Sequence, residues 1–156
     1  METADLSDPA YWESESPDLR LNPLRPVETT GLRDSLVGEL GVKASLVLAT
    51  SGSGGNAKFV VLPKTSLLAS ARAVNAHCGL TAEDVWLGGL STFHVGGIGI
   101  FARAFANGAR VAPVPWDSWV RDGSVFLEAV RREEATLASL TPAHLRDLVQ
   151  AGARRP

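Results

Sequence analysis

The residues best suited to chemistry lie near position 50, in a loop rich in glycine and hydroxyl groups. Residues 49–60 read Ala-Thr-Ser-Gly-Ser-Gly-Gly-Asn-Ala-Lys-Phe-Val. Glycines let backbone N–H groups converge on an anion, hydroxyls add donors, and a lysine supplies a mobile positive charge that suits phosphate. The pattern predicts a phosphate-binding loop, whose expected contacts are Thr50, Ser51, Gly52, Ser53, Gly54, Gly55 and Lys58.

This loop matches neither of the two commonest phosphate loops. The nucleotide P-loop needs a Gly-Lys pair followed by a hydroxyl residue, and the sequence has no such run. The dinucleotide fingerprint needs a third glycine where Ala57 stands. A flexible turn joining two strands is therefore the open alternative, because Ser/Gly turns are common.

A second candidate group lies about 40 residues further on, where residues 90–99 read Leu-Ser-Thr-Phe-His-Val-Gly-Gly-Ile-Gly. Gly96 and Gly97 open a predicted helix, and the free N–H groups and dipole of a helix N-terminus favour an anion such as a carboxylate. His94 stands beside them as a possible hydrogen-bond donor. The alternative is a capped core helix with a structural histidine.

Together the two motifs resemble those of the adenylate-forming enzymes, the acyl-CoA synthetase and luciferase superfamily, over roughly residues 44–150. The loop of that family runs Thr-Ser-Gly-Ser/Thr-Thr-Gly-x-Pro-Lys-Gly. The sequence departs from it in having Gly54 for threonine, Ala57 for proline and Phe59 for the last glycine. The His-Val-Gly-Gly form is most similar to the 2-succinylbenzoate–CoA ligase branch, which acts in menaquinone biosynthesis.

The resemblance implies an ATP-dependent acid–CoA ligase, which forms an acyl-AMP and then a CoA thioester. It implies ATP, Mg²⁺, coenzyme A and an aromatic or succinyl-aryl carboxylic acid as small-molecule ligands of a full-length enzyme. The loop would hold the ATP phosphates, and His94, Gly96 and Gly97 would border the acyl site. The family's magnesium-binding glutamate, ribose-binding aspartate and catalytic lysine come after the segment that ends at Pro156. The 156 residues alone are therefore expected to be an inactive N-terminal fragment, with no catalytic residue and no required cofactor.

Two alternatives to the ligase remain. One is a truncated, non-catalytic module that binds a partner or a phosphorylated ligand. The other is an unrelated α/β enzyme whose glycine-rich loop holds another phosphorylated cofactor.

The composition of the chain argues against several classes of binding partner and site. The charges nearly cancel, with 15 Lys+Arg against 17 Asp+Glu, and no basic patch is interleaved with aromatics, so nucleic acid is not expected. No apolar run approaches the ~18 residues of a membrane span, and the single cysteine, Cys78, fits a cytoplasmic protein. The histidines and Cys78 lack metal-ligand spacing, so no metal site is expected. A lobe of a larger sheet exposes a strand edge, which favours a homo-oligomer.

The apolar pattern predicts an α/β fold with a largely parallel sheet flanked by helices. The resemblance implies that this sheet corresponds to part of the large N-terminal domain of an adenylate-forming enzyme. Residues 1–43 are expected to form an extended arm with a short helix at 32–40, and 44–156 an α/β lobe. The expected strands are 44–49, 58–62, 84–90, 109–114 and 135–140, and the expected helices are 65–77, 96–107, 122–132 and 142–151.

Overall fold

The computed structural model describes residues 5–23, 27, 29–51, 57–114, 122–150 and 152. At positions 33, 51 and 57 it describes the backbone but not the side chain. The chain divides into two compact units, Met1–Ser70 and Ala71–Pro156, and each is described by itself. The first contains α1 (Pro9–Glu13), β1 (Asp18–Arg20), α2 (Leu32–Asp34), the π-helical turn η1 (Ser35–Glu39), β2 (Ser45–Ser51), β3 (Ala57–Pro63) and the start of α3 (Lys64–Cys78). The second contains the rest of α3, then β4 (Val85–Gly88), α4 (Val95–Asn107), β5 (Arg110–Pro113), α6 (Gly123–Arg132), β6 (Leu137–Ala138) and α7 (Pro142–Gln150).

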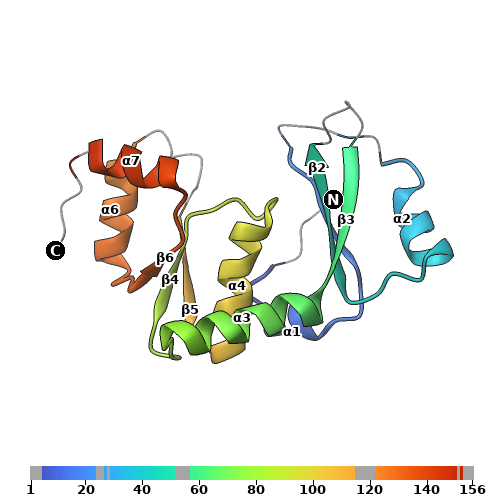
Figure 1. The fold of residues 1–156 in the computed structure, drawn as a ribbon, viewed down its shortest axis with the longest axis horizontal. Helices are drawn as coiled ribbons and strands as arrows, with labels where there is room; N and C mark the ends of the chain where they lie inside the picture. Colours follow the sequence, from blue (N-terminus) through green and yellow to red (C-terminus); the bar gives the residue numbers. More distant parts are fainter. Residues whose placement is uncertain are drawn as a thin grey trace. The chain divides into compact units, whose positions relative to one another are not determined.

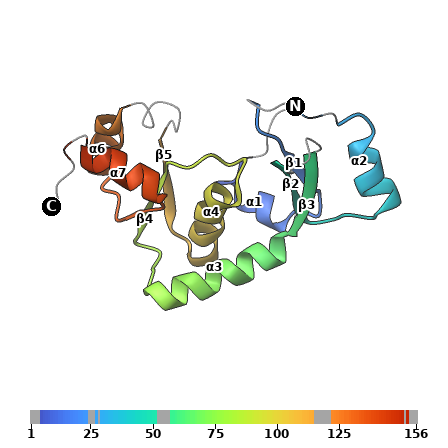
Figure 2. The same cartoon turned by 45° about the horizontal axis from the view of Figure 1, so that its top comes forward.

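The sheet of the first unit has the order β1-β2-β3 (Figure 2). Strand β2 lies in the middle, and its Leu46, Val47 and Leu48 are buried although successive side chains point to opposite faces. The two strands predicted around the glycine-rich loop are confirmed as β2 and β3. They pair antiparallel, in contrast to the parallel alternation of the second unit. A connection as short as theirs permits an antiparallel hairpin, whereas parallel neighbours need a crossover of a dozen or more residues.

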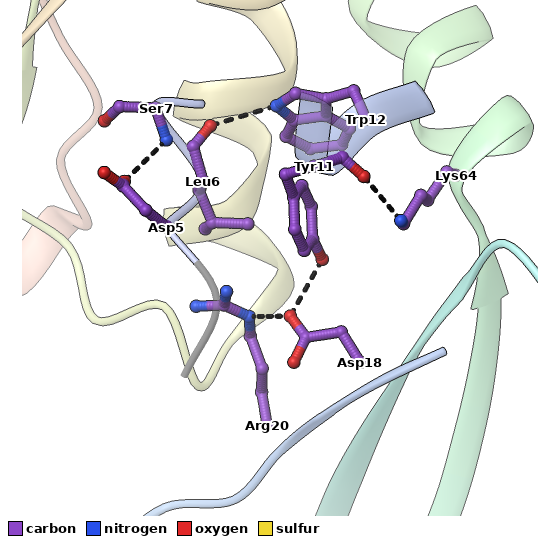
Figure 3. Close-up of polar contacts among 8 residues, drawn as sticks. All are labelled: Asp5, Leu6, Ser7, Tyr11, Trp12, Asp18, Arg20 and Lys64. Carbon is purple, nitrogen blue, oxygen red and sulfur yellow. Dashed lines mark hydrogen bonds and ion pairs between the residues drawn. The ribbon is translucent and has the colours of Figure 1, made fainter. Parts of the chain in front are cut away.

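The N-terminal segment is more structured than the expected extended arm. Asp8 caps α1, and β1 pairs in parallel with β2. Leu6, Tyr11 and Trp12 are buried, and the indole N–H of Trp12 donates to the carbonyl of Leu6 at 3.0 Å (Figure 3). The prolines and acids of this segment therefore do not prevent it from contributing to the core. The domain boundary expected at 43/44 stays a prediction.

A polar network joins α1 to β1 (Figure 3). The Tyr11 hydroxyl donates to Asp18 Oδ2 at 2.9 Å, and Arg20 Nε donates to the same oxygen at 2.5 Å. The guanidinium of Arg20 also lies 5.6 Å from the centroid of the Tyr11 ring. Arg20 is only 3% exposed, so its charge is balanced by Asp18 within the fold.

The network predicts a loss of stability at alkaline pH. Burial, and then the Asp18 carboxylate, raise the pKa of Tyr11 well above its usual value of about 10. The contribution of Tyr11 is thus complete below about pH 10, where the unfolded tyrosine is still protonated, and is lost as the pH rises towards the folded-state pKa. We expect Tyr11→Phe to cost about 1 kcal/mol of unfolding free energy near pH 8. That difference should disappear near pH 11, because each pH unit above the unfolded pKa removes up to about 1.4 kcal/mol.

Denaturant unfolding of both proteins between about pH 8 and pH 11 measures this difference. Burial lowers the pKa of Lys64, but this residue is present in both proteins, so its ionisation cancels in the comparison. A difference that does not change with pH would contradict the raised pKa.

The short helix expected at 32–40 forms as α2 followed by η1. Only part of its apolar face is covered: Leu36 is 7% exposed, but Val37 is 44% and Leu40 71% exposed. The sequence period placed these side chains on one face, and the fold covers only the part of that face around Leu36.

The second unit has a three-layer arrangement around a parallel sheet of order β5-β4-β6. Trp86 of β4 packs with Ile100 and Ala104 of α4, whereas the next residue, Leu87, packs with Phe126 of α6 and Leu148 of α7. Both views agree, since α4 lies on one side of β4 and β5, and α6 and α7 on the other (Figure 1, Figure 2). The expected α/β class, with a parallel sheet and helices on its faces, is confirmed.

The elements of this unit follow the predicted ranges, with shorter strands. The predicted strand 84–90 forms only as Val85–Gly88, and 135–140 only as Leu137–Ala138. Pro142 begins α7 as expected, and the backbone N–H of His144 donates to Thr141 Oγ1 at 3.2 Å. Among the described residues, no helix is long and apolar enough to span a membrane.

Candidate functional site

The described ends of the predicted phosphate loop face each other across the β2–β3 hairpin. Thr50 pairs with Lys58 in the antiparallel register, so their side chains leave the same face of the sheet. Both residues are exposed, and the Thr50 hydroxyl donates to the backbone carbonyl of Lys58 at 3.3 Å. A hydroxyl and a mobile cation thus flank the loop, as phosphate binding would require.

The structure does not describe the middle of the predicted phosphate loop. Gly52, Ser53, Gly54 and Gly55 lie outside the described residues, and Ser51 is described only as the last residue of β2. Their expected phosphate contacts stay predictions.

The second candidate group lies at the start of α4. His94 is the N-cap residue, with an extended backbone, and its side chain is exposed and makes no capping hydrogen bond within the described residues. Gly96 is also exposed, whereas Gly97 is buried. A Cβ atom at Gly97 would lie 2.2 Å from the carbonyl oxygen of Ser91, but one at Gly96 would meet only a Leu90 methyl group at 3.6 Å.

These two glycines therefore serve different purposes. Gly97 is required by the close passage of the Ser91 backbone, independently of any ligand, while Gly96 leaves the helix N-terminus open on its exposed side. The roles of His94, Gly96 and Gly97 at an acyl site stay predictions.

The structure adds Arg103 of α4, a residue that the motifs did not single out. Its Nη2 donates to Ser139 Oγ at 2.9 Å, and its guanidinium carbon lies 4.6 Å from the Trp86 ring. Its Nε atom is buried without a hydrogen-bond partner among the described residues, as is the indole N–H of Trp86. Burial lowers the pKa of Arg103, but a guanidinium remains charged at neutral pH.

Buried donors are nearly always paired, so two unpaired donors beside a half-buried charge mark a place suited to an acceptor. Gly99 makes room for the guanidinium, because a Cβ atom there would lie 3.1 Å from Arg103 Nη1. A carboxylate or an ordered water is the kind of acceptor with which these donors would pair.

The sequence carried a signal for this residue. Arg103 is the single charged residue of the largely apolar helix α4. A lone charge in a helix that packs on a sheet must be paired, exposed or functional, and only the tertiary structure separates these cases.

No group of three or more His, Cys, Asp or Glu side chains that could hold a metal occurs in the part of the chain that the structure describes.

The comparisons with known proteins agree with the motif resemblance. The sequence pattern of the family described as AMP-binding enzyme matches residues 43–155. This chain belongs to that family. The matched region contains both the hairpin and α4, so both candidate groups lie within the AMP-binding region.

Two curated relatives carry the same activity in their names. A 2-succinylbenzoate–CoA ligase of Bacillus cytotoxicus is 31% identical over 108 residues, and that of Bacillus mycoides is 30% identical over the same length. Each alignment covers 69% of this chain and 22% of the relative. The chain thus spans about a fifth of the length of the curated relatives it matches.

Solved structures confirm the fold as part of the N-terminal domain of adenylate-forming enzymes. An o-succinylbenzoate CoA synthetase from Bacillus subtilis, bound to a product analogue, superposes with a TM-score of 0.64 at 26% identity, over 71% of this chain and 22% of that one. The same enzyme in complex with ATP and magnesium ion gives a TM-score of 0.60 at 25% identity over the same shares.

Proposed function

We propose that these residues form the N-terminal part of an acid–CoA ligase that activates 2-succinylbenzoate. The observation that carries the proposal is the 31% identity over 108 residues to a named 2-succinylbenzoate–CoA ligase, together with the AMP-binding family match. In the first step, a carboxylate oxygen of the acid attacks the α-phosphorus of ATP, and the bond to pyrophosphate breaks. In the second, the thiol of coenzyme A attacks the acyl carbon and AMP leaves.

The hairpin would contribute charge stabilisation rather than covalent chemistry. Lys58 and Thr50 offer an ammonium and a hydroxyl on one face of β2–β3, and the loop between them would complete the contacts to the phosphates. Magnesium and coenzyme A belong to the proposal as ligands of a full-length enzyme. The cytoplasm is its proposed location, which suits the exposed free thiol of Cys78. The expected self-association stays a prediction.

Arg103 would bind a carboxylate of the acid. Its charge, its unpaired Nε–H and the unpaired Trp86 N–H are the donors that a carboxylate needs. The relatives are named for 2-succinylbenzoate, which is a carboxylic acid. The positive charge of Arg103 on α4 would attract such an acid in addition to any apolar contact.

We expect Arg103→Met in a full-length enzyme to raise the KM for the acid by about tenfold or more, because hydrogen bonds to charged groups contribute about 1.5–3 kcal/mol. The KM for ATP should change little. Acid-dependent exchange of pyrophosphate into ATP measures both, and Arg103→Lys, which keeps the charge, should recover part of the loss. An unchanged KM for the acid in Arg103→Met would remove Arg103 from the site.

The same assay tests the function itself. Exchange that depends on 2-succinylbenzoate supports the ligase, whereas a full-length protein that binds ATP without exchange would point to the non-catalytic module instead.

A further inference from the structure

Lys64 is a buried cation at the junction of β3 and α3. Its side chain is 2% exposed, and the ion pairs of the described residues do not include it. Its ammonium group instead donates to the backbone carbonyls of Tyr11 at 2.5 Å and Ser14 at 2.9 Å, and lies 4.3 Å from the centroid of the Tyr11 ring. Burial lowers its pKa, and the charge of Asp18 acts in the opposite direction.

These contacts complete a closed series of interactions within the first unit, of which Figure 3 shows the links from Lys64 to Tyr11 and from Tyr11 to Asp18. Lys64 holds the C-terminal end of α1, Tyr11 joins α1 to Asp18 of β1, β1 pairs with β2, and β2 pairs with β3, which ends directly before Lys64. The base of the hairpin is thus tied to a segment about 50 residues earlier in the chain.

Burying the ammonium group of Lys64 has a free-energy cost, because the group loses its contacts with water. The two backbone carbonyls and the Tyr11 ring replace part of that hydration. The segment that it holds, residues 5–20, precedes the family match, which begins at residue 43. The family pattern therefore does not account for this contact.

We propose that residues 5–20 and Lys64 form an arm clamp that fixes the β2–β3 hairpin for phosphate binding, with Lys64 as a positioning residue. This rests on the proposed function of the hairpin. The clamp acts at the base of the hairpin, and the candidate phosphate contacts Thr50 and Lys58 lie at its other end.

The first test is hydrogen exchange on the 156-residue chain. In Lys64→Met, the backbone amides of β1 and β2 should exchange about tenfold faster or more, since a buried set of charge-assisted hydrogen bonds is lost. The matched control is Lys43→Met, because Lys43 is also a lysine of this unit but its side chain is 74% exposed and its ion pair, with exposed Glu15, is long at 3.9 Å. Equal exchange in the two variants would overturn the clamp.

If Lys64→Met does not fold, a second variant still tests the clamp. Tyr11→Phe removes only the hydroxyl that donates to Asp18 and keeps the ring and both carbonyls that hold Lys64. It should increase exchange in the same strands by a smaller factor, and an unchanged pattern in this folded variant would also overturn the clamp.

The second test separates the clamp from the proposed function. In a full-length enzyme, Lys64→Met should raise the KM for ATP at least about fivefold and leave the KM for the acid nearly unchanged, because the phosphate contacts are displaced. Faster hydrogen exchange with an unchanged KM for ATP would overturn the positioning role. If the wild-type protein shows no ATP-dependent exchange, the proposed function fails, and hydrogen exchange still decides whether the clamp exists.

Discussion

Replacing Lys58 by alanine in a full-length enzyme is expected to slow adenylation by about 10²–10³. The reason is electrostatic: removing one donor aimed at charge that develops in the transition state typically has an effect of this size. Lys58 is exposed on β3 and opposite Thr50, so its side chain is available to phosphate and contributes little to the core. The melting temperature should therefore stay nearly constant, as for other surface substitutions.

Two variants control this experiment. Lys43→Ala removes an exposed lysine of the same unit that forms a 3.9 Å ion pair with exposed Glu15, and should change neither rate nor stability. Lys58→Arg keeps the charge and should retain part of the activity. Pyrophosphate exchange and thermal unfolding are measured together on all four proteins. Unchanged exchange in Lys58→Ala would show that the hairpin is only a connector, and a large drop in melting temperature would make Lys58 structural.

Gly97→Ala is expected to destabilise the second unit severely. The new Cβ atom would lie 2.2 Å from the Ser91 carbonyl oxygen, 2.6 Å from its carbon and 2.9 Å from the Leu90 carbonyl oxygen. All three are backbone atoms, so a rotamer change gives no relief and the start of α4 must move. We expect a loss of about 3 kcal/mol or more, at or beyond the upper end of ordinary overpacking.

Gly96→Ala is the matched control, since it adds the same methyl group one residue earlier. Its Cβ atom would make an ordinary contact with a Leu90 methyl group at 3.6 Å. Stability should change by less than about 1 kcal/mol, with the higher helix propensity of alanine favouring the variant. Denaturant unfolding of the chain compares the two. Similar stabilities would mean that α4 does not pass the Ser91 backbone as closely as described.

The sequence by itself determined the elements and the family. The apolar period gave α3, α4, α6 and α7 within a residue or two, because their hydrophobic faces and end signals are local properties of the chain. The order of hydroxyls, glycines and lysine around position 50, with the His-Val-Gly-Gly run, was enough to place the chain among AMP-binding enzymes. Such motifs are readable because their chemistry depends on residues close together in sequence.

Only the tertiary structure decided which residues meet across long separations. The buried contacts of Lys64 with α1 and of Arg103 with Trp86 and Ser139 join residues from 17 to more than 50 positions apart, and no local pattern encodes them. The N-terminal segment read as an extended arm because its prolines and acids are poor local formers of structure, yet pairing with β2 and packing around Trp12 order it. The two adjacent glycines of α4 look equivalent in sequence, and the approach of the Ser91 backbone makes only Gly97 indispensable.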